Sequence, residues 1–215
     1  MKPLASIFYA PGTNCEEETM AAFQLAGAKT KLVLVNDLIS GKAKATDCDI
    51  AVFPGGFAEG DYIDTGIVTA TVAGEFILEL VEAEKIIIGI CNGFQILVRA
   101  GVFGPNVTLT RNDCGKFVSR PILHRVERSA CLWTVGLEEE ILGFPSAHGG
   151  GKVVWRGEKP NVALTYSSKS PNGGRIAGIT TSPGGLVFGL MDHPERPYGN
   201  PDGQKILKNG VRFAN

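Results

Sequence analysis

A cysteine flanked by glycines is the feature of this sequence best suited to covalent chemistry. Cys91 lies between Gly89 and Gly93 in the stretch KIIIGICNGFQIL, residues 85–97. The apolar run before it is typical of a buried strand, and the pattern after it is typical of a helix. A strand, a sharp turn and a helix in this order form a nucleophile elbow, here with cysteine in place of serine. The helix dipole favours the reactive thiolate at such a turn, so we expect a nucleophile rather than a small core residue.

A cysteine nucleophile needs a base, and the base needs an orienting group. His193 follows an apolar strand pattern, and Glu195 lies two positions further on. Pro194 disfavours a helical conformation at the histidine, and in an extended segment residues i and i+2 point the same way. We therefore predict His193 as the base and Glu195 as its orienting group, with Asp192 pointing to the opposite side. His124, in an alternating strand pattern, is interpreted as a surface residue or a satisfied strand residue.

Glycine-rich segments and two amides could complete such a site. In FPGGFAEGDY, which ends a strand, Gly55 or Gly56 can turn a backbone N–H toward an oxyanion, although a simple tight turn explains the pattern equally well. The backbone N–H of Asn92 can serve the same purpose. Gln95 either reaches a polar substrate or caps local backbone groups. His148, in the segment SAHGGGK, is predicted to lie in a loop better suited to binding than to proton transfer.

The elements that must position these groups alternate through the first half of the chain. We predict strands over 4–10, 30–36, 48–56 and 85–90, and helices over 16–28, 69–83 and 92–101. Continuous apolar strands between helices indicate a parallel sheet covered on both faces. In such sheets the active site lies outside the carboxyl ends of the strands.

The second half consists of short β-rich segments, over 116–127, 152–157, 161–168, 174–182 and 186–195. Glycine, proline and asparagine separate them, so they form either an antiparallel extension or further core strands. The expected fold is α/β, a flavodoxin-like three-layer sandwich with a mostly parallel central sheet and an added antiparallel β-rich part. A single domain over 1–215 is expected. The tail after Arg196 is polar and turn-rich, either an ordered extension or an arm that reaches a partner.

Composition excludes several classes of function. The formal net charge is -1 and no basic run occurs, which argues against nucleic acid or an anionic membrane as a partner. No apolar window approaches the ~20 residues of a membrane span, and the N-terminal stretch is too short for a secretory signal. The five cysteines are odd in number and form no CxxC pair, so neither a disulfide framework nor a metal site is expected. A cytoplasmic location fits this composition.

Seven segments together resemble a known family: APGTNCEEET, FPGGFAEGDY, GICNGFQILVRAG, LTRNDCGKFVSR, AHGGGK, SPNGGRIAGI and GLMDHPER. They are similar to the class I, triad-type glutamine amidotransferases, and more closely to glutaminase subunits of purine biosynthesis, over nearly the whole chain. The resemblance implies a catalytic triad of Cys91, His193 and Glu195. It implies that oxyanion and substrate contacts come from Gly55, Gly56, Asn92, Gln95, His148, Gly149 and Gly150. Two departures occur: the family usually has His-Gly-Glu-Gly-Arg where this chain has residues 148–152, and serine where it has Cys114.

The resemblance also implies an activity and its partners. Glutamine would be hydrolysed to glutamate and ammonia through a glutamyl thioester. The ammonia would pass to an ATP-dependent synthetase subunit that makes formylglycinamidine ribonucleotide, with a small accessory subunit in the complex. No cofactor is expected in this chain, which lacks a phosphate loop; ATP and Mg are expected on the synthetase. The loops at the carboxyl edge of the sheet, including Thr13–Asn14 and Asp61–Tyr62, are the expected docking surface.

Two other functions are compatible with a reactive cysteine on this scaffold. The first is a cysteine hydrolase such as a peptidase or a glyoxalase, in which a histidine directly follows the nucleophile. Here Asn92 takes that position, which argues against this class. The second is a non-catalytic binding subunit that keeps the pocket for regulation, and an intact triad argues against it.

Overall fold

The computed structural model describes residues 1–57, 67–181, 183–197 and 199–214, so the expected docking residues Asp61–Tyr62 lie outside the described part. The strands are β1 Leu4–Tyr9, β2 Lys29–Leu34, β3 Ile50–Phe53, β4 Ile86–Ile90, β5 Val107–Arg111, β6 Val118–Val126, β7 Ile141–His148, β8 Gly150–Trp155, β9 Asn161–Tyr166, β10 Ile176–Thr180 and β11 Val187–Leu190. The α-helices are α1 Glu16–Ala26, α2 Val35–Ile39, α3 Ile67–Glu82, α4 Asn92–Arg99 and α5 Pro201–Phe213, and a 3-10 helix covers Leu132–Thr134. None of the described helices is long and apolar enough to cross a lipid bilayer.

Nine strands form one sheet in the order β2-β1-β3-β4-β11-β10-β9-β6-β7. The first five of these pair in parallel, and each pair from β11 to β7 is antiparallel. The predicted α/β fold, a parallel sheet extended by antiparallel strands from the second half, is confirmed. β11 comes from the second half but joins the parallel part beside β4, with Leu190 opposite Ile90. Because of this register, the residues that follow the two strands meet at the same edge of the sheet.

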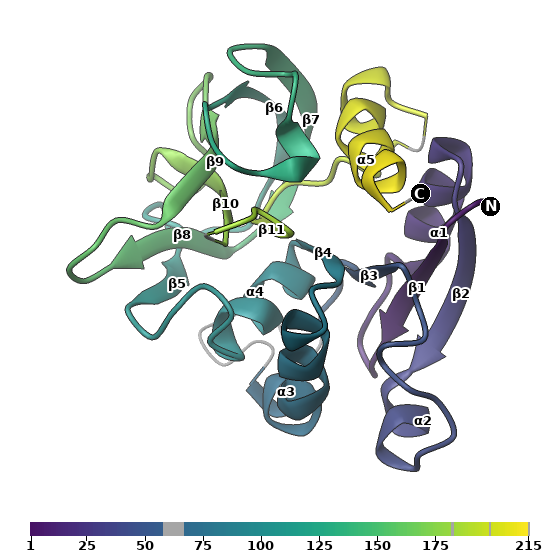
Figure 1. Ribbon diagram of the computed structural model, residues 1–215. Helices are drawn as coiled ribbons and strands as arrows, with labels where there is room; N and C mark the ends of the chain where they lie inside the picture. Colours follow the sequence, from purple (N-terminus) through teal and green to yellow (C-terminus); the bar gives the residue numbers. More distant parts are fainter. Residues whose placement is uncertain (58–66, 182, 198, 215) are drawn as a thin grey trace.

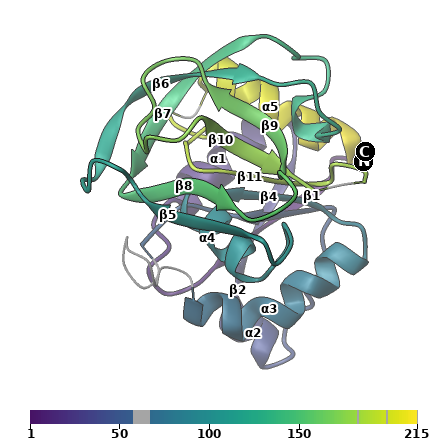
Figure 2. The same ribbon diagram turned by 90° about the vertical axis from the view of Figure 1, so that its left-hand side faces the viewer.

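Helices cover both faces of the parallel strands (Figure 1). α1 and α5 pack together on one face, over a core that includes Phe23, Ile88 and Leu207. α3 and α4 cover the other face, over a second core that includes Ile77 and Ile87. Figure 2 shows the same layers from the side, with α3 and α1 on opposite sides of the sheet. The continuous burial of β3, β4 and β11 explains why these strands are apolar along their whole length.

The glycine-rich segment around His148 is more regular than the sequence suggests. β7 runs through His148 and β8 begins at Gly150, so the predicted loop is a tight connection between two strands. β8 lies outside the large sheet and pairs antiparallel with β5 in a two-stranded sheet. A Cβ at Gly151 would lie 2.4 Å from the side chain of Met191, so a larger residue here would require Met191 or β8 to shift.

The tail is a helix rather than a turn-rich segment. Asn200 caps α5 by accepting a hydrogen bond from the backbone N–H of Asp202 at 3.1 Å, and Pro201 occupies the first turn. Gln204 donates to the carbonyl of Ala22 in α1 at 3.0 Å. The tail is therefore an ordered part of the fold, and the two ends of the chain lie close together (Figure 1).

Candidate active site

Cys91 lies where the chain turns sharply from β4 into α4. Its backbone has φ 52° and ψ -109°, a conformation that residues other than glycine adopt only under strain. The side chain is 6% exposed, at the N-terminus of α4, where the helix dipole favours negative charge. The predicted elbow is therefore present, and it holds a thiol at the carboxyl edge of the parallel strands.

The glycines on either side of Cys91 are required by close packing. A Cβ at Gly93 would lie 1.9 Å from the carbonyl oxygen of Phe53, at the end of β3. A Cβ at Gly89 would lie 2.6 Å from the side chain of Leu97 and 2.9 Å from the backbone of Gly93. The absence of both side chains lets the first turn of α4 sit directly on β3 and β4.

His193 and Glu195 form the pair expected from their spacing. Nδ1 of His193 lies 2.7 Å from Oε1 of Glu195, and both side chains are almost completely buried. The carboxylate therefore fixes the orientation of the ring, with Nδ1–H as the donor. Nε2 of His193 has no hydrogen-bond partner among the described residues, which leaves this atom available for proton transfer. Asp192 does not contact the pair and points elsewhere, as predicted.

The pKa of His193 depends on burial and on its neighbours Glu195 and Cys91. Burial alone would lower its pKa, but the Glu195 carboxylate and the nearby Cys91 sulfur outweigh burial and raise the pKa to about 10. An imidazole with this pKa stays protonated at neutral pH. The arrangement therefore favours an imidazolium beside Cys91, which is the partner that a thiolate nucleophile requires.

The space between nucleophile and base is bordered by the backbone of Gly55. A Cβ at this position would lie 2.9 Å from Sγ of Cys15, 2.9 Å from Cε1 of His193 and 3.5 Å from Cβ of Cys91. Its neighbour Gly56 forms a β-bridge with Thr13 that holds the turn in place. The turn thus lies beside the reacting groups, and its use as an oxyanion donor remains a prediction.

The side chains of Asn92 and Gln95 are buried and bonded to each other, and the use of the Asn92 backbone N–H as an oxyanion donor remains a prediction. Nδ2 of Asn92 donates to Oε1 of Gln95 at 3.1 Å, and Nε2 of Gln95 donates to the carbonyl oxygen of Gly150 at 2.8 Å. This chain of hydrogen bonds connects the first turn of α4 to the start of β8. Gln95 therefore places the Gly149–Gly150 connection beside the elbow, and its contact with substrate remains a prediction.

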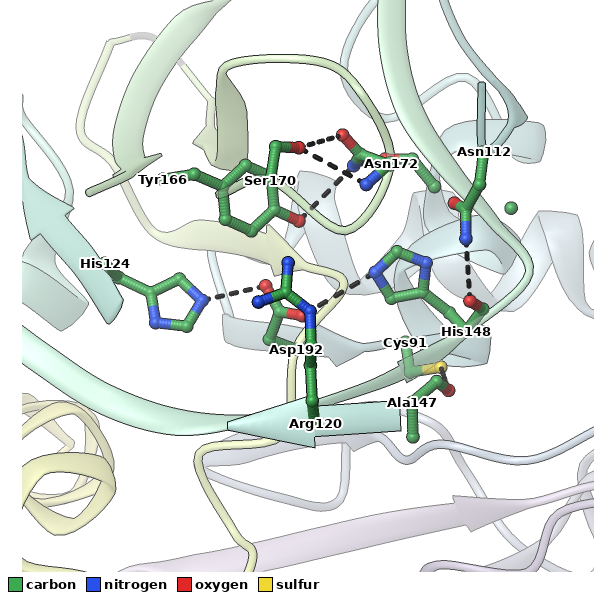
Figure 3. Close-up of polar contacts among 12 residues, drawn as sticks. Cys91, Asn112, Arg120, His124, Ala147, His148, Tyr166, Ser170, Asn172 and Asp192 are labelled. Atoms are coloured by element: carbon green, nitrogen blue, oxygen red, sulfur yellow. Dashed lines mark hydrogen bonds and ion pairs between the residues drawn. The ribbon is translucent and has the colours of Figure 1, made fainter. Parts of the chain in front are cut away.

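His148 is buried at the end of β7 and belongs to a second polar cluster (Figure 3). Its Nε2 lies 3.6 Å from Oδ1 of Asp192, whose other oxygen lies 2.8 Å from Nε2 of His124. Its carbonyl oxygen accepts a hydrogen bond from Asn112 at 2.8 Å. Of the two readings for His124, the satisfied strand residue is correct and the surface residue is wrong, because its side chain is fully buried and paired.

Cys15 also lies beside the site, although no motif in the sequence distinguishes it from the other cysteines. The Cys15 thiol is buried next to the Gly55 turn and lies 2.8 Å from Nη2 of Arg196, which also pairs with Glu18. Burial raises its pKa well above the ordinary value, against the opposing effect of Arg196. The signal that could have found it is positional, because Cys15 follows the loop after β1 and so lies at the same sheet edge as the triad.

Cys15, His193 and Glu195 offer ligand atoms that lie within 4.8 Å of one another, a spacing that a metal ion could use. Two observations weigh against a cation there. The guanidinium of Arg196 already contacts the thiol, and the hydrogen bond to Glu195 already uses Nδ1 of His193. The geometry fits an acid–base pair better than a metal centre.

Comparisons with known proteins show the family to which this chain belongs. Residues 2–208 match the family of the CobB/CobQ-like glutamine amidotransferase domain. Phosphoribosylformylglycinamidine synthase subunit PurQ of Thermotoga maritima is 37% identical over 221 residues, which cover 99% of each chain. The protein of the same name from Dehalococcoides mccartyi is 36% identical over 248 residues, which cover 97% of this chain and 96% of the relative. A chain in the solved structure of PurLQS from Thermotoga maritima superposes with a TM-score of 0.88, at 34% identity and over the full length of both chains.

The fold and the site define a glutamine amidotransferase, and the chain belongs to the family of the CobB/CobQ-like glutamine amidotransferase domain. Within that family it groups with the PurQ subunits, which it matches over nearly its full length. The resemblance noted in the sequence is therefore confirmed, and the chain is an enzyme component of the amidotransferase type.

Proposed function

We propose that this chain is the glutaminase subunit of phosphoribosylformylglycinamidine synthase and acts in purine biosynthesis through a triad of Cys91, His193 and Glu195. The observation that carries the proposal is the 2.7 Å hydrogen bond between His193 and Glu195, made at the sheet edge where the strained Cys91 turn also lies. The full-length similarity to PurQ subunits supports the choice of reaction.

The geometry supports a two-step hydrolysis. The Cys91 thiolate attacks the side-chain amide carbon of glutamine, and backbone N–H groups at Gly55, Gly56 and Asn92 stabilise the tetrahedral oxyanion. His193 donates its Nε2 proton to the departing nitrogen, so ammonia leaves and a glutamyl thioester remains. His193, now neutral, takes a proton from water as the water attacks the thioester. Glutamate leaves, and the thiolate–imidazolium pair is restored.

The second half of the reaction belongs to other chains. We assign ATP and Mg to a synthetase subunit, which would use the ammonia to make formylglycinamidine ribonucleotide, and we include a small accessory subunit in the complex. The solved relative from Thermotoga maritima, described as part of PurLQS, supports a complex of this kind. Cys91 and His193 are 6% and 2% exposed, so we expect glutamine to gain access when the synthetase docks.

Replacement of the nucleophile tests the proposal directly. In the complex with the synthetase of the same organism, Cys91→Ala should abolish glutamine-dependent synthesis of formylglycinamidine ribonucleotide and leave ammonia-dependent synthesis intact. Cys114→Ala is the matched control, because this cysteine is free and exposed. Glutamine-dependent synthesis at the wild-type rate by Cys91→Ala would overturn the proposal.

A diazo ketone analogue of glutamine distinguishes the proposal from the two other functions considered above. Modification of Cys91 that is selective and is blocked by glutamine supports a glutaminase. A peptidase or glyoxalase would lose no reactivity in the presence of glutamine, and a non-catalytic subunit would bind glutamine without being modified.

A further inference from the structure

Asp192 is a fully buried carboxylate beside the base, and the hydrolysis does not use it. Oδ2 of Asp192 lies 2.8 Å from Nε2 of His124, and Oδ1 lies 3.6 Å from Nε2 of His148. Burial alone would raise its pKa, but the two imidazoles outweigh burial and hold the pKa well below its usual range. A buried ion of this kind is costly unless it is paired. His124 supplies a hydrogen bond to Oδ2, whereas Oδ1 forms no hydrogen bond among the described residues and lies only at ion-pair distance from His148.

The cluster joins two parts of the fold that are distant in the sequence. His124 lies on β6 and His148 ends β7, so both belong to the antiparallel hairpin at the edge of the sheet. Asp192 directly precedes the predicted base, in the segment that continues from β11. In Figure 3 the carboxylate lies between the two imidazoles, and Cys91 and Ala147 lie beyond His148. Asp192 therefore connects the hairpin to the catalytic edge of the parallel strands.

The end of β7 contacts both reacting residues. The carbonyl oxygen of Pro145 accepts the backbone N–H of His193 at 2.8 Å. The carbonyl oxygen of Ala147 lies 3.7 Å from Sγ of Cys91 and accepts the thiol hydrogen bond. A shift of β7 would therefore move base and nucleophile relative to each other. The contact between Asp192 and His148, the residue that follows Ala147 in the chain, opposes such a shift.

We propose that Asp192 is a positioning residue that fixes the separation of Cys91 and His193 by holding the end of β7 against the segment that carries the base. This role rests on the proposed glutaminase function. It concerns geometry in the reacting complex, so removal of the charge should slow the chemical steps and leave the affinity for glutamine nearly unchanged.

The test is Asp192→Asn in the full chain, assayed with the synthetase. We expect kcat for glutamine hydrolysis to fall about tenfold or more, with KM changed less than about twofold, because a small displacement of reacting groups is enough for such losses. Alkylation of Cys91 by iodoacetamide, followed on its peptide by mass spectrometry, should slow as well. Alkylation of the exposed Cys114 in the same sample should keep its rate and serves as an internal reference.

The matched control makes the same chemical change at the other end of β7. Oδ2 of Asp202 accepts the backbone N–H of Gly143 at 2.9 Å, so Asp202→Asn also removes a carboxylate that holds this strand. We expect its kcat to match that of the wild type. If Asp192→Asn does not fold, His124→Gln tests the positioning role in its place, because it removes the imidazole that pairs with Oδ2 of Asp192 and leaves the carboxylate. We expect His124→Gln to lower kcat at constant KM.

The outcomes separate the two proposals. A wild-type kcat in Asp192→Asn, or in His124→Gln where that variant decides, would overturn the positioning role, provided that Cys91→Ala is inactive. A raised KM with unchanged kcat would also overturn it, since the cluster would then act on substrate binding. Full turnover by Cys91→Ala would instead overturn the proposed function.

Discussion

The backbone N–H of His193 donates a 2.8 Å hydrogen bond to the carbonyl oxygen of Pro145 in β7. The predicted base follows the parallel strand β11, and this bond attaches it to the antiparallel extension as well. The extension therefore contributes to the site, because the carbonyl oxygen of Ala147, at the same end of β7, also accepts a hydrogen bond from the Cys91 thiol. The second half of the chain both supplies the base and sets its position.

Glu195 is expected to act through its charge. Glu195→Gln keeps the size of the side chain but removes the anion that raises the pKa of His193. With a less basic imidazole and a less firmly fixed tautomer, kcat for glutamine hydrolysis should fall about 10²-fold or more. Steady-state kinetics of the complex measure this change.

The control for Glu195→Gln is Glu140→Gln. Glu140 is a surface carboxylate that pairs with Lys205 at 2.6 Å, and such exposed pairs contribute little to stability. Its kcat should equal that of the wild type. Equal activities of the two variants would contradict the role of Glu195.

Gly55→Ala should inactivate the enzyme without unfolding it. The added methyl group would lie 2.9 Å from both Cys15 and His193, so either the Gly55 turn or the imidazole must move. Displacement of reacting groups by about 1 Å can lower the rate about 10²-fold. Glutaminase assays and circular dichroism on the same preparation separate lost activity from lost structure.

Gly74→Ala is the matched control for Gly55→Ala. Gly74 lies inside α3, and nothing lies within 4 Å of the position that a Cβ would take. Alanine there should stabilise the helix by about 0.5–1 kcal/mol, as measured by thermal unfolding, and leave kcat unchanged. If Gly55→Ala also retained full activity, the turn would not border the reacting groups.

Two glycines of α5 should differ in their effect on activity. A Cβ at Gly203 would lie 1.8 Å from the carbonyl oxygen of Pro194, the residue that separates His193 from Glu195 in the chain. A Cβ at Gly210 would instead lie 2.2 Å from Trp133 in the core. Both alanine variants should lose about 1–3 kcal/mol of stability by overpacking. Only Gly203→Ala should also lower kcat, and equal kcat values for the two folded variants would argue against a link between α5 and the base.

The raised pKa of His193 predicts a pH-dependent contribution to stability. The group binds its proton more tightly in the folded protein, with a pKa of about 10, than in the unfolded chain, where about 6.5 is expected. Its contribution is therefore complete below about pH 6.5 and declines as the pH rises toward 10. Glu195 raises the pKa more than Cys91 does, so the direction should persist in a Cys91→Ala background, where the thiol does not titrate.

Urea unfolding of Cys91→Ala with and without His193→Gln, measured between pH 6 and 10, tests this contribution. The difference in the free energy of unfolding between the two proteins should shrink as the pH rises. A difference that stays constant or grows would show that the pKa of His193 is not raised by its neighbours.

The sequence was sufficient to predict the parallel strands, the elbow and the His193–Glu195 pair, because each depends on local pattern. The helix α5 was not predicted, because Gly203 and Gly210 suggest turns. Both positions need glycine for close packing, against Pro194 and Trp133 respectively. The residues that lower helix propensity are thus the residues that let this helix fit.

β7 and the cluster around Asp192 could not be predicted for a different reason. The inward-facing positions of β7 include the buried polar residues Ser146 and His148, which obscure the alternation expected for a half-buried strand. Spacing correctly indicated that Asp192 points away from Glu195. Its partners His124 and His148 come from other strands, and no local pattern indicates such a contact.

The central claim is that Cys91 carries the glutamyl group during turnover, and the most direct test is to trap that intermediate. The complex is mixed with glutamine, quenched in acid within the first turnovers and digested for mass spectrometry. We expect a glutamyl thioester on the peptide that contains Cys91, at a level that rises in a burst before steady state. Glutamate production with an adduct on another residue, or with undiminished turnover in Cys91→Ala, would contradict it.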